Sequence, residues 1–163
     1  MEKMVTTLLV AAAVCVMVLQ GVQGRHMPNP FLLQGRVYCD TCRAGFETSA
    51  TTYIHGAKVR VECKNRKTQE VLYSVEGVTD STGTYRLTIK EDHLDQLCDA
   101  VLVSSPLHGC ATADPGRDRS RVILTRYNGI TEDTRFANAL GFMKDVAMSG
   151  CSMILQQYQE SED

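Results

Sequence analysis

Apolar and polar residues alternate every two positions over much of the chain between residues 34 and 125. In segment 58–64 the apolar positions are Val59, Val61 and Cys63, and in segment 84–90 they are Tyr85, Leu87 and Ile89. The positions between them are charged or polar. A two-residue period is typical of antiparallel strands that have one face in the core and the other in water. We therefore predict two half-buried strands here.

Weaker strand patterns occur at Gln34–Cys39, Glu70–Val78, Cys98–Ser104 and Arg121–Arg126. Turn-forming residues separate them, including Asp80-Ser81-Thr82-Gly83 and Asn128-Gly129. Two other segments differ, because Glu91–Leu97 suits one helical turn and Asn138–Phe142 a terminal strand or anchored loop. Many short strands without a long helical period predict an all-β domain, either a sandwich or a small barrel.

The first 24 residues have the three-part pattern of a secretory signal peptide. Lys3 supplies positive charge, Leu8–Leu19 forms an apolar run, and Gly24 offers a small residue at a plausible cleavage point. A membrane anchor is the competing interpretation, but the run is shorter than the roughly 20 residues that span a bilayer. We predict cleavage, secretion to the extracellular space and no membrane insertion.

Three segments are predicted after the leader. Residues 25–33 contain Pro28 and Pro30 and suit an extended N-terminal arm, 34–155 form a single β domain, and 156–163 are a polar, acidic tail. The whole chain has a net charge of −2. This balance gives no electrostatic reason to expect nucleic acid as a partner.

Six cysteines remain once the leader, with Cys15, is removed: Cys39, Cys42, Cys63, Cys98, Cys110 and Cys151. In a secreted domain an even number of cysteines predicts disulfides, three in this case, although spacing alone does not fix the pairing. Each disulfide adds about 2–4 kcal/mol to the free energy of unfolding.

The Cys39-Asp40-Thr41-Cys42 segment permits three interpretations. A thiol oxidoreductase would need a helix start after the cysteines, and residues 43–49 do not resemble one. A zinc site would need a second close pair, which the wider spacing of the other cysteines does not provide. We favour two structural disulfides that leave the motif in different directions.

Other candidate chemistry is weak, and no cofactor or metal site is predicted. The histidines of the mature chain are His26, His55, His93 and His108, and we expect each in a solvated loop. Asp80–Gly83 resembles the opening of a calcium loop, but it lacks enough carboxylates, which favours a β-turn. For carbohydrate recognition the chain has no Trp, and Tyr53, Tyr127 and Tyr158 are the tyrosines expected at the surface.

The segment Gln34–Arg43 resembles the signature of the olive-type (Ole e 1) major pollen allergen family, which includes extensin-like relatives. Its characteristic residues here are Gly35, Val37, Tyr38, Cys39, Asp40, Thr41, Cys42 and Arg43. The similarity continues through Gly56–Lys64, Thr79–Tyr85, Cys98–Ser105 and Asn138–Phe142, and all six cysteines match the family's order.

The resemblance implies a seven-stranded antiparallel β-barrel or sandwich, immunoglobulin- or transthyretin-like. It also implies the disulfides Cys39–Cys110, Cys42–Cys151 and Cys63–Cys98. Many relatives are glycosylated at a late Asn-Gly-Thr turn, whereas this chain has Asn128-Gly129-Ile130 and no acceptor sequence there.

Function follows from the same resemblance. Relatives are secreted plant proteins of anther and pollen, linked to pollen-tube growth, and have no established general catalytic activity. We predict a non-enzymatic apoplastic protein that recognises an extracellular protein, such as a cell-surface receptor, or a cell-wall component. The alternatives are a thiol oxidoreductase that uses Cys39 and Cys42, and a cell-wall polysaccharide binder.

Overall fold

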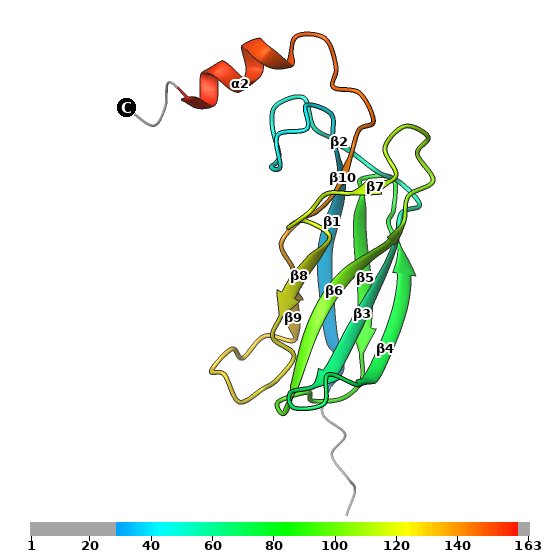
Figure 1. Ribbon diagram of the computed structural model, residues 1–163. Coiled ribbons are helices and arrows are strands. Elements are labelled where there is room, and N and C mark those ends of the chain that lie inside the picture. Colours follow the sequence, from blue (N-terminus) through cyan, green and yellow to red (C-terminus); the bar gives the residue numbers. More distant parts are fainter. Residues whose placement is uncertain (1–28, 160–163) are drawn as a thin grey trace, which may run out of the picture.

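The computed structural model describes residues 29–159, so the predicted leader (1–24) lies outside the described residues. Two β-sheets pack face to face in an elongated sandwich, and a short helix lies at one end (Figure 1). The elements are β1 Phe31–Asp40, β2 Thr52–Tyr53, β3 Lys58–Asn65, β4 Val71–Val78, β5 Thr84–Ile89, β6 Gln96–Ser104, β7 Thr112–Ala113, β8 Arg119–Val122, β9 Thr134–Phe136, β10 Leu140–Met143 and α2 Cys151–Gln159.

Strand β1 organises the first sheet. Its first half, Phe31–Arg36, pairs antiparallel with β5 on one side and parallel with β9 on the other. Its second half, Val37–Asp40, pairs antiparallel with β2 and parallel with β10, and β7 extends the sheet beyond β10. The first half alternates between buried and less buried side chains, whereas every residue of the second half is buried.

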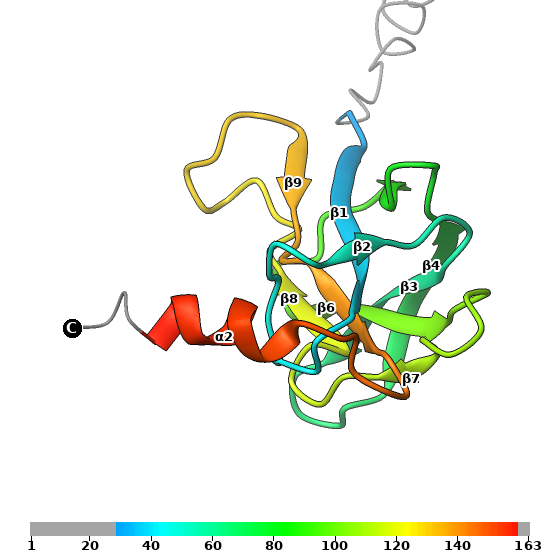
Figure 2. The same cartoon turned by 90° about the horizontal axis from the view of Figure 1, so that it is seen from above.

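The second sheet is antiparallel throughout and has the strand order β4-β3-β6-β8. Strand β3 lies at its centre, and Cys63 on β3 is directly opposite Cys98 on β6. Within the described part of the chain, strand β8 pairs only with β6, and β9 of the other sheet pairs only with β1. The polypeptide between these two strands, residues 123–133, projects from the sandwich (Figure 2).

The core lies between the two sheets and contains the apolar positions that the alternation identified. Val59, Val61 and Cys63 from β3 are buried, and so are Tyr85, Leu87 and Ile89 from β5. Their strand neighbours on the other face are less buried, apart from Thr84. The predicted strands at 58–64 and 84–90 are confirmed, because a two-residue period places one side chain in two against the opposite sheet.

The prediction of a β domain is confirmed, and of the two predicted architectures the structure has the open, two-sheet one; a seven-stranded antiparallel barrel is not what it contains. The described residues form ten strands in two sheets that do not close, and two of the pairings with β1 are parallel. These parallel pairings arise because β9 and β10 return from the far end of the sequence and lie beside the first strand. Local alternation carries no information about such long-range pairing.

Several predicted boundaries differ from those observed. Strand β1 begins at Phe31, so residues 31–33 belong to the first sheet and not to an extended arm. Helix α2 reaches Gln159, so residues 156–159 are helical and not part of a tail. Glu91–Leu97 forms no helical turn; Asp92 Oδ1 accepts a hydrogen bond from Leu94 N, which makes a turn before β6.

Helix α2 comprises nine residues, of which Cys151 is buried. Among residues 29–159 there is no helix with the length and apolar character needed to cross a membrane.

Candidate functional site

The signature segment is almost entirely buried. Seven of its residues, Gly35, Val37, Tyr38, Cys39, Asp40, Thr41 and Cys42, are buried, and Arg43 is exposed. Tyr38 packs against Gly141 of β10. Burial raises the pKa of Tyr38 to about 12, so the phenol stays protonated under ordinary conditions. The buried residues form the framework of one end of the sandwich, whereas Arg36 and Arg43 of the segment are exposed.

Polar contacts from this segment hold the C-terminal region. Asp40 accepts hydrogen bonds from Cys42 N and Gly45 N at 3.2 and 2.7 Å, which shapes the turn after β1. Arg43 has a φ of 55° and donates to the carbonyls of Lys144 and Asp145. The Arg43 side chain is therefore used to fasten the segment between β10 and α2.

The disulfides join Cys39 to Cys110, Cys42 to Cys151 and Cys63 to Cys98. This is the pairing that the family resemblance implies. Cys39 and Cys42 are both buried and each is bonded to a distant cysteine. A dithiol oxidoreductase needs two neighbouring cysteines that bond to each other in the oxidised form, so this arrangement gives the Cys39/Cys42 alternative no geometric support.

The expectation of solvated histidines was wrong for His93. His55 and His108 are exposed, but His93 is buried and its ring lies 4.6 Å from the ring of Tyr73. The residue sits in the turn before β6, where His93 N donates to Leu124 O and draws the side chain inward. His26 lies outside the described residues.

A second buried polar group lies near the signature. Asp114 is 5% exposed, and its Oδ2 atom has no hydrogen-bond partner in the described part of the chain. Burial, followed by the negative charge of Asp40, raises the pKa of the Asp114 carboxyl. Because the two carboxyl groups interact unfavourably in a buried environment, we assign this pair an electrostatic effect on stability.

The predicted turn at Asp80 is confirmed. Asp80 Oδ1 accepts hydrogen bonds from Thr82 N, Thr82 Oγ1 and Thr84 N. These bonds, with a further one from Arg86, hold the pKa of Asp80 well below its usual range. The carboxylate is thus occupied by local donors in a turn.

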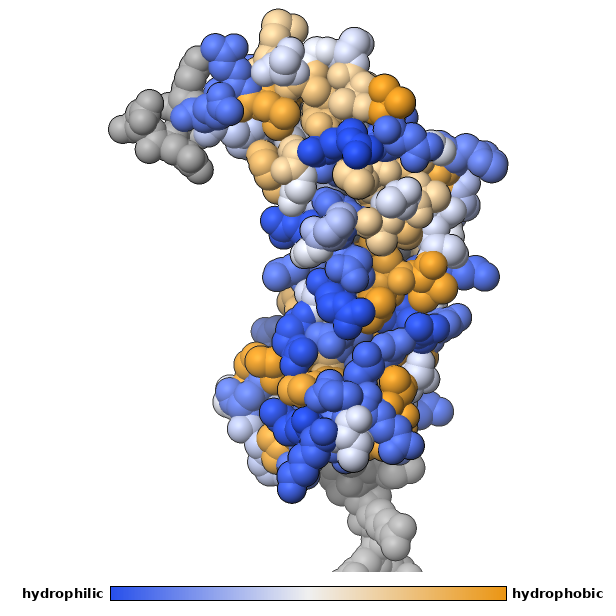
Figure 3. All heavy atoms as spheres, viewed as in Figure 1, coloured by the Kyte–Doolittle hydropathy of each residue, from blue (hydrophilic) through white to orange (hydrophobic). Residues whose placement is uncertain are grey.

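Exposed apolar side chains gather around strands β8 and β9. They are Ile123, Tyr127, Ile130 and Phe136, and we call this group the β8–β9 surface. Tyr127 is 80% exposed and Phe136 is 70% exposed. A cleft of about 400 Å³ is lined by Ile123, Ile130 and Phe136, together with the charged residues Arg121, Glu132 and Arg135. Figure 3 shows hydrophobic side chains among hydrophilic ones near the loop that follows β8.

The loop that carries Tyr127 and Ile130 is held in place by two arginine side chains, those of Arg135 and Arg126. Arg135 is buried, and its guanidinium donates to the carbonyls of Thr125, Ile130, Glu132 and Thr134. Arg126 forms an ion pair with Asp133 at 2.6 Å. The guanidinium groups of Arg126 and Arg135 lie 4.6 and 4.7 Å from the ring of Phe31, which is within cation–π range.

Asp92 anchors the start of the same loop. Its Oδ2 atom accepts hydrogen bonds from Thr125 Oγ1 and Arg126 N. Burial by itself raises the pKa of Asp92. The hydrogen bonds to its carboxylate lower the pKa by more than burial raises it, so the net shift is downward. A surface loop fixed by this many contacts loses little conformational entropy on binding.

The exposed side chains of the β8–β9 surface include residue types common in protein–protein interfaces. Aromatic residues and arginine are enriched at the centres of protein–protein interfaces, where they fill pockets and exclude water. By contrast, the ring of Tyr53 is covered by the guanidinium of Arg36 at 3.4 Å. Sequence reasoning identified Tyr127 as a surface residue but missed Ile123, Ile130 and Phe136, because alternation did not show which face of each strand stays uncovered.

Residues 29–159 match the protein family described as "Pollen protein Ole e 1 like". The chain is 44% identical to the pollen-specific protein C13 of Zea mays, over 94% of this chain and 91% of that protein. It is 45% identical to the protein DOWNSTREAM OF FLC of Arabidopsis thaliana, over 93% and 92% of the two chains. The crystal structure of the major plantain pollen allergen Pla l 1 matches with a TM-score of 0.66 and 32% identity, over 75% of this chain and 99% of that one.

Proposed function

Because this chain belongs to the family of Ole e 1-like pollen proteins, we propose that it is a secreted, non-enzymatic pollen-type protein that recognises an extracellular protein partner through its β8–β9 surface. The place of action is the apoplast around pollen or the growing pollen tube. The description of the maize relative as a pollen-specific protein supports the tissue assignment.

Secretion is supported by the leader and the cysteines together. The leader pattern of residues 1–24 directs a chain out of the cytosol. Three disulfides suit an oxidising compartment and are rare in proteins that stay in the reducing cytosol. The two observations are independent of each other and agree.

One observation carries the assignment of the binding face: the exposed side chain of Phe136. An aromatic side chain that is 70% exposed on a regular strand leaves apolar area in water without a structural benefit to the monomer. It lines a cleft together with Ile123 and Ile130. Covering this area with a partner gains about 25 cal/mol for each Å² of apolar surface removed from water.

The charged groups around the cleft fit a protein partner better than an anionic polymer. Arg121 extends from β8, but Asp99 pairs with it at 2.6 Å, so its charge is largely compensated. Glu132 and Arg135 also line the cleft and contribute opposite charges. An acidic wall polysaccharide would meet no net positive surface here, and a protein with a complementary apolar patch would meet no repulsion.

A capture experiment with matched variants tests the proposal. The disulfide-bonded protein is immobilised and exposed to pollen-tube wall and membrane extracts, in parallel with Phe136→Ser and Val78→Ser. Both residues are exposed apolar side chains on strands, but Val78 lies on β4, outside the β8–β9 surface. Circular dichroism of each variant checks that the fold is retained.

We expect a protein that is captured by the wild-type chain and by Val78→Ser but is lost with Phe136→Ser. Equal capture by all three chains, or no enriched protein, would contradict the proposal. A glycan array run with the same proteins separates the carbohydrate alternative: retention of pectins or xyloglucans that does not depend on Phe136 would favour polysaccharide binding elsewhere on the molecule.

A further inference from the structure

Asn128 and Gly129 form an exposed turn in the loop between β8 and β9. This loop, residues 123–133, projects from the sandwich (Figure 2). Both residues are exposed, and Gly129 has a φ of 80°, a left-handed conformation that glycine adopts readily. An asparagine followed by glycine is prone to lose ammonia from its side chain, because the missing Cβ atom leaves the next backbone nitrogen open to close approach.

The side chain of Asn128 is folded over the peptide bond that follows it. Asn128 Oδ1 accepts a hydrogen bond of 3.1 Å from Ile130 N, which is the arrangement of an Asx-turn. The ring that this hydrogen bond closes contains both Cγ of Asn128 and the backbone nitrogen of Gly129. Because the bond draws electron density from the side-chain carbonyl, it makes Cγ easier for a neighbouring nitrogen to attack.

The two nitrogens that take part in such a reaction are not engaged elsewhere. Within residues 29–159, Gly129 N donates no hydrogen bond, and neither does Nδ2 of Asn128. Gly129 N can therefore lose its proton to water, and Nδ2 can leave, without breaking a hydrogen bond of the described fold.

The other asparagines of the chain lack this combination. Asn29 is followed by proline, whose nitrogen carries no hydrogen. Asn138 is followed by alanine and Asn65 by arginine. Asn65 Oδ1 also accepts a hydrogen bond from the backbone nitrogen two positions on, at 2.8 Å. Asn65 is therefore an internal control that has the same hydrogen bond but a bulky next residue.

We propose that Asn128 is a site of spontaneous deamidation and that the product weakens recognition through the β8–β9 surface. Gly129 N loses its proton and bonds to Cγ of Asn128, while Nδ2 takes up a proton and leaves as ammonia, which gives a cyclic imide. Water then opens the imide at either carbonyl carbon. One opening gives aspartate at position 128, and the other gives isoaspartate, in which the main chain runs through Cβ. The overall reaction consumes water and releases ammonia.

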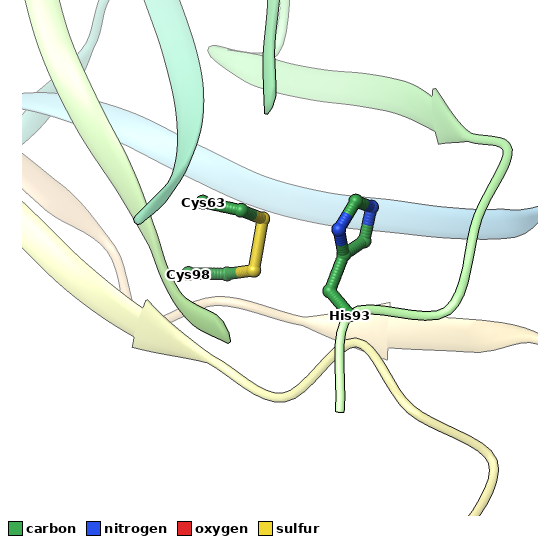
Figure 4. Close-up of side chains that lie close together, drawn as sticks. All are labelled: Cys63, His93 and Cys98. Atoms are coloured by element: carbon green, nitrogen blue, oxygen red, sulfur yellow. A yellow bond between two sulfur atoms is a disulfide. The ribbon is translucent and has the colours of Figure 1, made fainter. Parts of the chain in front are cut away.

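The base of the loop is fixed, so the reaction alters the turn and not the fold. Leu124 O accepts a hydrogen bond from His93 N, and the buried imidazole of His93 faces the Cys63–Cys98 disulfide (Figure 4). The guanidinium of Arg135 also donates to carbonyls of the loop. The β-sheet signal in circular dichroism should therefore stay the same after deamidation.

The product places a new charge at the recognition loop. Asn128 lines a cleft of about 330 Å³ together with Arg66, Arg121 and Tyr127. A carboxyl group at position 128 is ionised above a pH of about 3.9, so it adds a negative charge next to Tyr127 of the β8–β9 surface. A partner that covers this surface would have to bury the new charge, which costs free energy.

The isoaspartate form also lengthens the main chain by a methylene group, which shifts Tyr127 relative to Ile130. Both effects on recognition rest on the proposed function of the β8–β9 surface. The deamidation itself does not, because it depends only on the geometry of Asn128 and Gly129. The two parts are therefore tested separately.

Ageing of the folded protein tests the reaction. The disulfide-bonded protein is incubated in mildly alkaline and in acidic buffer and is then digested at acidic pH. Mass spectrometry follows the peptides that contain Asn65, Asn128 and Asn138, and methyl transfer by protein isoaspartate methyltransferase detects the isoaspartate form. We expect conversion at Asn128 alone, and faster conversion in alkaline buffer, because the attacking nitrogen must lose a proton. No conversion at Asn128, or equal conversion at Asn65, would overturn the proposal.

Glutamine variants test the assignment to position 128. Asn128→Gln keeps a neutral amide, but its longer side chain closes an imide ring far more slowly, so the conversion should be lost. The matched control Asn65→Gln should convert at Asn128 as the wild type does, and circular dichroism checks each fold. Unchanged methyl transfer to aged Asn128→Gln would overturn the proposal.

Capture from pollen-tube extract tests the effect on recognition. Wild type, Asn128→Asp and Asn128→Gln are compared, and Phe136→Ser is the reference for lost recognition. We expect Asn128→Asp to retain less of the protein that the wild type captures, and Asn128→Gln to retain as much. Equal capture by wild type and Asn128→Asp, with loss in Phe136→Ser, would overturn this effect and leave the proposed function intact. If no chain captures a protein, the proposed function fails, whereas the mass spectra still decide the deamidation.

Discussion

Cys42 and Cys151 are 109 positions apart in the sequence, yet their Cα atoms lie 5.3 Å apart and a disulfide joins them. Cys42 follows the first strand, and Cys151 is the first residue of α2. Beside the bond, Met148 N donates to Thr41 O, and Lys144 N donates to Asp40 O. The C-terminal region is thus fixed to the end of β1 by covalent and hydrogen-bonded links.

Replacing both Cys42 and Cys151 with Ser should lower the free energy of unfolding by about 2–4 kcal/mol, because the disulfide closes a long loop in the unfolded chain. The amides of α2 should also exchange faster with solvent. Urea unfolding and hydrogen exchange measure the two effects. Met153→Ala, an exposed position on α2, serves as control; unaltered α2 protection in the double variant would contradict this account.

Gly35→Ala should destabilise the domain by about 1–3 kcal/mol, the usual effect of overpacking a core. A Cβ atom at Gly35 would lie 2.5 Å from Cζ and 2.9 Å from Cε1 of the buried Tyr85 ring. Combining Gly35→Ala with Tyr85→Leu removes the collision, so the double variant should lose less stability than the sum of the two single changes. If the stability losses of Gly35→Ala and Tyr85→Leu add exactly in denaturant unfolding, the Tyr85 ring does not collide with a Cβ atom at position 35.

Asp114→Asn should raise the free energy of unfolding at neutral pH. Burial and the charge of Asp40 raise the pKa of Asp114 in the folded state. The folded protein therefore keeps this proton over a pH range in which the unfolded chain has released it, and stability falls as pH rises from about 3.9, the usual Asp value, through the folded pKa.

The advantage of Asp114→Asn should accordingly shrink as the pH is lowered below that range. Urea unfolding across a pH series measures this trend, with the exposed Asp95→Asn as control. A gain that is the same at every pH, or a loss at neutral pH, would be inconsistent with an ionised Asp114 that opposes folding.

Arg135→Met should loosen the loop that carries Tyr127 and Ile130 of the β8–β9 surface. The substitution leaves the carbonyls of Thr125, Ile130 and Thr134 without the guanidinium donor. Hydrogen bonds to charged groups contribute about 1.5–3 kcal/mol, so we expect a loss of this order and faster hydrogen exchange in residues 125–133. Arg119→Met, at an exposed side chain, is the matched control. Equal hydrogen exchange of residues 125–133 in both variants would show that Arg135 does not hold the loop in place.

The sequence was most informative where a pattern reflects local geometry. Alternation at Val59–Cys63 and Tyr85–Ile89 identified two core strands, because a strand in a sandwich buries every second residue. Turn chemistry located the bend at Asp80, where the carboxylate accepts three local hydrogen bonds. These features depend on residues a few positions apart.

Features that depend on distant contacts were not predictable in this way. The parallel pairing of β1 with β10 brings Val37 beside Leu140, and no short-range pattern reports it. His93 is buried because its turn bonds to Leu124 O, and Arg135 because four carbonyls surround its guanidinium. Phe136 is exposed because Arg135, the preceding residue of β9, points inward and Phe136 therefore lies on the outer face. The residues next to Phe136 in the sequence did not predict this exposure.

The most direct test of the recognition surface is photo-crosslinking at a single residue. A benzoylphenylalanine placed at position 136 is compared with the same group at position 78, each in the disulfide-bonded protein, after illumination with pollen-tube extract. Our account predicts a discrete crosslinked protein from position 136 and none from position 78. Adducts that form at position 78, with none at position 136, would contradict recognition through the β8–β9 surface.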